Sequence, residues 1–129
     1  MPAQARSADR VFKTAWFARA ARKAGVDDKE LCRAIKQVMA GQADDLGGGV
    51  FKKRLSSNLY RSIILAKGGR YWVYEYLFAK SDRPNIDDAE LRAFRELAKG
   101  YEMLTKLQLT KLLKDKDLME ICHGDQAQV

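Results

Sequence analysis

The chain has 129 residues, of which 47% are hydrophobic and 32% are charged. This length suits one domain with a real core, and the balance excludes both a disordered chain and two ordinary domains. The formal net charge of +7 favours polyanions or acidic proteins as partners, and no apolar run is long enough to span a membrane.

The N-terminal half begins with a predicted strand over residues 10–14, whose apolar content is a Val-Phe pair. Apolar residues at helical spacing then predict two helices. Gly25 ends the first of them. Asp27 or Asp28 caps the second, which Gly41 ends. The two helices are expected to form a hairpin whose apolar sides cover a sheet.

Residues 42–49 include three consecutive glycines and are expected to form a loop that leads the chain tightly into the sheet. They are not a phosphate-binding loop, which requires Gly-Lys-Ser/Thr at the start of a helix.

Residues 50–80 are rich in β-branched and aromatic side chains, and only the sequences SSNL and GG interrupt them. This pattern predicts three consecutive strands joined by tight hairpins, with Gly68–Gly69 as a two-residue turn. The facing pairs that follow are Leu55 with Tyr60, Arg54 with Arg61, Lys52 with Ile63, Leu65 with Trp72, Ile63 with Tyr74, and Arg61 with Tyr76.

Because side chains alternate across a sheet, this register collects cations and aromatic rings on one face. Its predicted members are Lys52, Arg54, Arg61, Trp72, Tyr74 and Tyr76, with Lys80 following in phase. Like charges opposite each other destabilise a sheet, and a bound anion would relieve the pair of Arg54 and Arg61. Cations beside aromatic rings suit a phosphodiester whose bases stack alongside. The alternative is a solvated face on which Lys and Arg stems cover the rings.

The C-terminal part continues with helical patterns and a final alternating segment. Asp87 or Asp88 caps a third helix, Gly100 is expected to break or bend it, and residues 117–123 alternate as a short strand at the sheet edge. The element order predicts an α+β domain in which a helical hairpin packs on a small, mostly antiparallel sheet. We expect a flexible leader over residues 1–9, this single domain over residues 10–125 and a tail over residues 126–129.

The sequence contains two cysteines, Cys32 and Cys122, and one histidine, His123. Reduced thiols in a cytoplasmic protein are the simplest interpretation of so few cysteines. Adjacent residues of a strand point to opposite faces, so Cys122 and His123 are not expected to act together. No cluster of ligands accompanies them, and we expect neither a metal nor another cofactor.

The order of elements and the segments VFKKRLSSNLYRSIIL and YLFAKSDRPNI resemble the RelE-type toxins of bacterial type II toxin–antitoxin modules, in the RelE/ParE superfamily. The likeness is greater to the longer, HigB-like subgroup. There LGGGV opens the sheet, FAK closes it, and a leucine-rich helix precedes an acidic end. The resemblance covers residues 10–125.

This resemblance implies a ribosome-dependent endoribonuclease, an mRNA interferase that inhibits translation by metal-independent cleavage of mRNA. A ribose 2′-hydroxyl attacks the adjacent phosphate, which requires a base, cations for the developing charge and an acid for the leaving 5′-oxygen. By position, Lys52 and Arg54 match the two strand cations of the family, and Arg61 matches the arginine of the next strand. We expect Lys52 to be the base, a role that requires a lowered lysine pKa. Arg54 and Arg61 would stabilise the phosphate, and Lys80 and Arg83 would contact the RNA.

The sequence departs from the family pattern at two places. Related toxins often carry an arginine directly after the lysine that ends the sheet, and a tyrosine at the start of the last helix. Ser81 and Asp87 stand there in this chain. Arg83 could take the place of the arginine, and Tyr74 or Tyr76 the place of the tyrosine.

The resemblance also implies partners, namely the ribosome, mRNA and an antitoxin from an adjacent gene. In this subgroup the antitoxin has a helix-turn-helix fold and is HigA- or Xre-like. Three alternatives remain open at the level of the sequence: a ParE-like toxin that inhibits DNA gyrase, a non-catalytic nucleic-acid-binding module, and a basic scaffold without a ligand.

Overall fold

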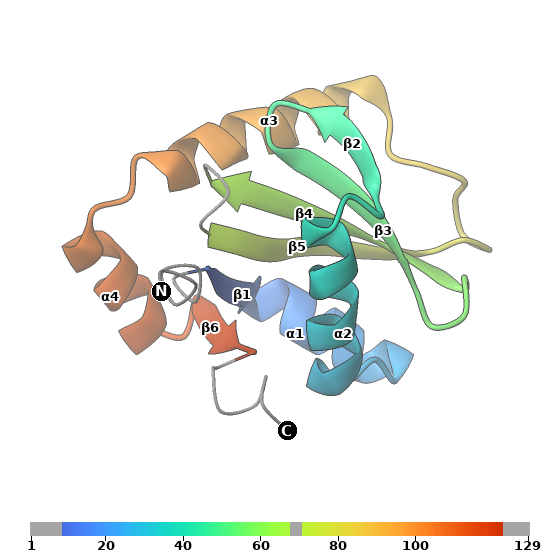
Figure 1. Ribbon diagram of the computed structural model, residues 1–129, viewed down its shortest axis with the longest axis horizontal. Helices are drawn as coiled ribbons and strands as arrows, with labels where there is room; N and C mark the ends of the chain where they lie inside the picture. The colour runs from blue at the N-terminus through green and yellow to red at the C-terminus, as the bar shows by residue number, and fades with distance from the viewer. Residues whose placement is uncertain (1–8, 68–70, 123–129) are drawn as a thin grey trace.

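The computed structural model describes residues 9–67 and 71–122 (Figure 1). Its elements in chain order are β1 (Arg10–Thr14), α1 (Ala15–Ala24), α2 (Asp28–Met39), β2 (Asp44–Gly47), β3 (Val50–Leu55), β4 (Tyr60–Lys67), β5 (Tyr71–Ala79), α3 (Asp88–Glu102), α4 (Lys106–Lys114) and β6 (Leu118–Ile121). The strands form one sheet in the order β2-β3-β4-β5-β1-β6. Of the neighbouring strand pairs in this described sheet, β1–β5 is parallel and the others are antiparallel. The predicted α+β class and mostly antiparallel sheet are confirmed.

The two faces of the sheet carry separate hydrophobic clusters. On one face, α1 and α2 pack over a cluster that includes Phe17, Ile35 and Ile64. On the other face, α3 and α4 pack over a cluster that includes Ile63 and Leu109. We call these the α1–α2 face and the α3–α4 face. No helix of the described residues is long and apolar enough to cross a membrane.

The ends of the first helices follow from local chemistry. Thr14 caps α1 by accepting a hydrogen bond from the backbone N–H of Phe17 at 3.0 Å. Gly25 ends α1 with φ of 76°, a left-handed conformation that suits glycine. Asp27 caps α2 by accepting a hydrogen bond from the N–H of Glu30 at 3.0 Å. The predicted ends at Gly25 and Asp27 are confirmed.

The glycine-rich segment contains a strand that the sequence did not predict. β2 pairs with β3, although residues 42–49 were expected to form only a loop. Gly49 has φ of 84°, and a Cβ atom there would lie 2.9 Å from the carbonyl oxygen of Ala66. The strand is held from the far side by Arg95 of α3, which donates hydrogen bonds to the carbonyls of Leu46 and Gly47. This support is tertiary, which explains why the local pattern did not reveal it.

The C-terminal elements agree with the sequence except at Gly100. α3 runs without interruption through Gly100, so the predicted break is wrong. β6 pairs antiparallel with β1 at the edge of the sheet, and the predicted last strand is confirmed. Arg10 and Glu120 join these two strands through an ion pair of 2.7 Å.

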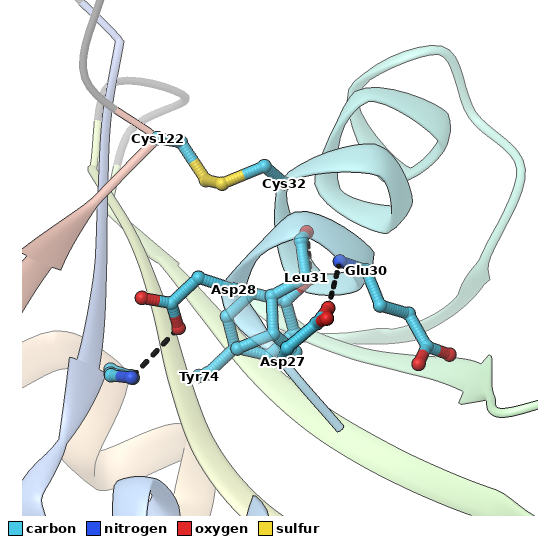
Figure 2. The surroundings of a disulfide bond; sticks show 8 residues. Asp27, Asp28, Glu30, Leu31, Cys32, Tyr74 and Cys122 are labelled. Carbon is cyan, nitrogen blue, oxygen red and sulfur yellow. Dashed lines mark hydrogen bonds and ion pairs between the residues drawn. A yellow bond between two sulfur atoms is a disulfide. The ribbon is translucent and has the colours of Figure 1, made fainter. Parts of the chain in front are cut away.

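Cys32 and Cys122 form a disulfide bond, with 5.4 Å between their Cα atoms (Figure 2). The expectation of reduced thiols is therefore wrong for this structure. The two residues lie 90 positions apart in the sequence. The pairing of β6 with β1 and the packing of α2 on the sheet bring them together, and no local pattern could indicate that distance. His123, the Gly68–Gly69 turn, the leader before Asp9 and the predicted tail lie outside the described residues.

Candidate nucleic-acid interface

Three cations lie on neighbouring strands of the α3–α4 face. Arg54 of β3 pairs with Arg61 of β4, and Lys52 of β3 pairs with Ile63 of that cluster. These pairs confirm the predicted register between β3 and β4. The two strands therefore bring Lys52, Arg54 and Arg61 to one side of the sheet, which we call the cation row.

The members of the cation row differ in exposure and in the side chains that they contact. Arg54 is exposed, and within residues 9–67 and 71–122 neither it nor Arg61 has a carboxylate partner. Lys52 lies 3.8 Å from a carboxylate oxygen of Asp44 and donates a hydrogen bond of 3.3 Å to the side chain of Asn85. Arg54 is thus the member that is most open to a ligand.

Arg61 is only 9% exposed, and its side chain is bonded to the turn between β3 and β4. One terminal nitrogen of its guanidinium donates to the carbonyls of Asn58 at 3.0 Å and Tyr60 at 3.3 Å. Asn58 has φ of 78°, as part of a left-handed turn that also includes two serines. Arg61 therefore supports this turn, whatever else it binds.

The predicted register fails on the other side of β4. Lys67 pairs with Tyr71, and this offset continues to the pair of Ile64 with Tyr74. Ile63 then pairs with Tyr76, so Glu75 is an extra residue of β5, a β-bulge. From Tyr71 to Tyr74 the pairing differs from the prediction by one residue, which places these side chains on the face opposite to the predicted one. From Tyr76 onward it differs by two residues, so these side chains lie on the predicted face.

This shift separates the aromatic residues that were predicted together. Trp72 and Tyr74 lie on the α1–α2 face, with exposed fractions of 7% and 0%. The hydroxyl of Tyr74 donates a hydrogen bond of 2.7 Å to the carbonyl of Leu31 (Figure 2), and burial raises the pKa of Tyr74 above its usual value. Their prediction as members of the cationic face is wrong, and such buried rings offer no surface for a nucleobase.

Tyr76 remains on the α3–α4 face, as predicted, and is surrounded by other rings. Its ring centroid lies 5.9 Å from that of Phe78 and 5.9 Å from that of Phe94. Trp16, at the start of α1, stacks on Tyr76 at 5.1 Å with an angle of 26° between the rings. Nothing in the sequence pattern had indicated that Trp16 lies beside Tyr76.

Arg83 lies beside Tyr76 but is held by an acidic partner. Its guanidinium forms an ion pair with Glu90 and donates a hydrogen bond of 3.4 Å to the hydroxyl of Tyr76. It also lies over the ring of Phe78, 5.6 Å from the centroid. The hydrogen bonds that Arg83 donates to the Glu90 carboxylate raise the pKa of Arg83 and lower the pKa of Glu90. Arg83 is therefore oriented toward Tyr76, with its charge balanced locally.

The two positions that depart from the family pattern lie at this end of the molecule. Asp87 caps α3 by accepting a hydrogen bond of 2.8 Å from the N–H of Glu90, while Glu90 accepts one of 2.8 Å from the N–H of Asp87. Lys80 and Ser81 are exposed directly after β5. The capping pair thus fixes the carboxylate that binds Arg83.

A depression of 240 Å³ adjoins the cation row at the edge of the sheet. Its lining residues are Gln42, Ala43, Asp44, Lys52, Lys53 and Arg54. Within the described ranges, no group of three or more His, Cys, Asp or Glu side chains could hold a metal ion. The site is therefore an open cationic surface with an aromatic border.

Comparison with known proteins identifies the family of the chain. Residues 9–121 match the family described as the RelE toxin of the RelE / RelB toxin–antitoxin system. Comparisons with curated proteins and with solved structures found no match. Since the matched segment covers most of the chain and the fold agrees with the expectation from the sequence, the chain belongs to the RelE toxin family.

Proposed function

We propose that the protein is a ribosome-dependent endoribonuclease that cleaves mRNA and so inhibits translation. The observation that supports this most directly is the pair of Arg54 and Arg61, placed opposite each other without a carboxylate partner among the described residues. Adjacent like charges are unfavourable in a sheet, and a phosphate between them would offset the repulsion.

The proposed chemistry is attack of a ribose 2′-hydroxyl on the adjacent phosphate, with release of the 5′-oxygen. Lys52 accepts the hydroxyl proton, and Arg54 and Arg61 stabilise the charge that develops on the phosphate oxygens. Lys80, Arg83 and Tyr76 contact the RNA around this centre. Because Lys52 lies on the strand neighbouring Arg61, base and phosphate ligands come from two paired strands.

The partners follow from the same assignment. The RelE family implies a cognate antitoxin. We propose that it has a helix-turn-helix fold of the HigA or Xre type, that the chain belongs to the HigB-like subgroup and that it acts in the cytoplasm. Co-expression with the neighbouring helix-turn-helix protein should restore growth of cells that produce the toxin.

Expression in bacteria of Lys52→Ala and Arg54→Ala, with Lys53→Ala as a matched control, tests the nuclease assignment. Lys53 is the next residue of β3, pairs with Ser62 and points to the other face, so its removal changes the charge equally. The wild-type and Lys53→Ala proteins should arrest growth and create new mRNA 5′ ends on primer extension. Loss of a base or of a charge-stabilising donor should slow cleavage roughly 100- to 1000-fold.

Arg61 requires a milder change, because Arg61→Ala would also remove support from the turn at Asn58. Arg61→Lys keeps the charge and should retain more activity than Arg61→Ala in cleavage on purified ribosomes. Intact mRNA together with trapped gyrase–DNA complexes would instead show a ParE-like toxin. Undiminished growth arrest by the Lys52→Ala and Arg54→Ala proteins would show that the assigned roles are wrong.

A further inference from the structure

The two tryptophans of the chain have opposite environments. Trp72 is 7% exposed within the core, whereas Trp16 is 45% exposed although it lies in a helix that packs on the sheet. A large indole left in water contributes little to folding, since the hydrophobic gain depends on the area removed from water. Within the described part of the chain, the stack on Tyr76 covers one side of the indole, and no other contact accounts for the exposed position of Trp16.

Two non-local features place Trp16 at the border of the cation row. β1 pairs in parallel with β5 as far as Lys13 with Tyr74, so the first turn of α1 begins level with Glu75 and Tyr76. The bulge at Glu75 turns Tyr76 toward the α3–α4 face. There the two rings stack at 5.1 Å, and Tyr76, itself half-buried against Phe94, supports the indole from behind.

Cationic side chains lie near this aromatic pair. Arg83 reaches the hydroxyl of Tyr76, and Phe78, the next but one residue of β5, pairs with Arg61. Lys52, Ile63 and Tyr76 form one row across β3, β4 and β5, because each pairs with the next. An RNA backbone on the cations thus has an aromatic surface within reach of its bases.

We propose that Trp16, supported by Tyr76, is a stacking platform for an unpaired nucleobase of RNA whose phosphates lie on the cation row. The proposal builds on the proposed function, since it names how the same site holds its RNA. Stacking between a base and an aromatic side chain tolerates any sequence, because every base has a π face. The platform therefore contributes affinity and position and selects single-stranded over paired RNA.

Direct binding of a short, fluorescein-labelled single-stranded RNA to the purified full chain tests this proposal. Trp16→Ala and Trp16→Leu should each weaken binding about 5- to 100-fold, which corresponds to the usual range for loss of one stacked base. Trp16→Phe should stay within a few-fold of wild type. Leu107→Ala, which removes an 80% exposed apolar side chain from α4, is the matched control and should bind as wild type.

Inorganic polyphosphate is the second probe, because it carries charge without bases. Stacking predicts that Trp16→Ala and Trp16→Leu leave polyphosphate binding unchanged while RNA binding falls. RNA should also quench the fluorescence of Trp16, and this quenching should be absent in Trp16→Phe, whose remaining Trp72 is buried. Circular dichroism confirms that each variant is folded, and Trp16→Leu keeps an apolar contact with Tyr76.

Three results would overturn the platform. RNA binding by Trp16→Leu at wild-type strength would show that no base stacks there. An equal loss of RNA and polyphosphate binding would show a structural role. Unchanged RNA binding together with lost antitoxin binding would show that Trp16 contacts a protein.

These outcomes separate the platform from the proposed function. Loss of RNA binding in the Trp16 variants without any mRNA cleavage by wild type would reject the nuclease and keep the platform. If wild type cleaves mRNA and the Trp16 variants match it in cleavage rate and in RNA affinity, the nuclease assignment is kept and the platform is rejected.

Discussion

Glu75 sets the direction of Tyr76 in the site, and its buried carboxyl lowers the stability of the fold when it is charged. As the extra residue of the bulge, it has no partner opposite it in β4. Its side chain is half-buried beneath α3, where the hydroxyl of Tyr101 donates a hydrogen bond of 3.1 Å. Burial raises the pKa of the Glu75 carboxyl, and the hydrogen bond from Tyr101 partly opposes this effect. Folding therefore disfavours the charged form of Glu75.

Glu75→Gln should increase the free energy of unfolding most at high pH. The folded pKa of Glu75 is raised, so its contribution to stability is complete below the unfolded value of about 4.3 and decreases as pH rises through the folded value. Glutamine stays neutral and can still accept from Tyr101. Urea unfolding at a series of pH values between about 4 and 8 measures the difference between variant and wild type.

Tyr101→Phe is the complementary variant. The hydroxyl of Tyr101 lowers the pKa of Glu75 in the wild type. Its loss in Tyr101→Phe should raise that pKa further and so steepen the pH dependence of stability, which Glu75→Gln removes. Parallel stability curves for wild type and Glu75→Gln over the whole pH range would contradict this account.

At the scale of elements, the disulfide connects two segments that few other contacts join. Cys32 lies in the middle of α2, and Cys122 follows β6, which is the outermost strand beside β1. β6 has only four residues, and its other support comes from its pairing with β1, from the Arg10–Glu120 ion pair and from α4. The bond therefore ties the C-terminal edge of the sheet to the helices of the α1–α2 face (Figure 2).

Reduction of this disulfide should destabilise the protein by about 3–5 kcal/mol, the range for a loop of this length. The cross-link spans 90 residues, so it restricts the unfolded chain strongly. Urea unfolding with and without dithiothreitol measures the effect. Cys32→Ser, Cys122→Ser and the double variant should each match the reduced wild-type protein and no longer respond to dithiothreitol, and equal stability of oxidised and reduced wild type would contradict the expectation.

At the scale of the whole molecule, positive charge lies on both sides of the sheet. The outer surface of α1 and α2 carries exposed cations without an ion-pair partner among the described residues, namely Arg19, Arg22, Lys23, Lys29, Arg33 and Lys36. Together with the net charge of +7, they provide a general attraction for RNA that does not depend on the cation row.

Salt dependence should separate this general attraction from the site. Each phosphate that a cation neutralises on a single strand contributes about −0.7 to the slope of log K against log salt concentration. Arg54→Ala should therefore reduce the magnitude of the slope by about 0.7 for a short RNA. The ammonium of Lys53, which points to the other face of β3, donates a hydrogen bond to the carbonyl of Gln42. Lys53→Ala should therefore leave the slope unchanged, and equal slopes for both variants would show that RNA does not lie on the cation row.

Much of this fold follows from short stretches of sequence. Gly25 and Asp27 mark helix ends because capping involves only neighbouring residues. The pairing of Arg54 with Arg61 follows from the short turn between β3 and β4, since loop length determines which residues face each other. Alternation then assigned Lys52 to the same face.

Tertiary structure decided the rest of the site. A one-residue offset that begins at the pair of Lys67 with Tyr71 placed Trp72 and Tyr74 on the opposite face, and the bulge at Glu75 returned Tyr76 to the face of the cations. Trp16 reaches Tyr76 only through the parallel pairing of β1 with β5, strands between which two helices and three other strands lie in the sequence. The sequence by itself determined the order of elements and the local turns. Contacts between distant segments determined which aromatic rings border the cations, because such contacts depend on the whole chain and leave no periodic signal in any one segment.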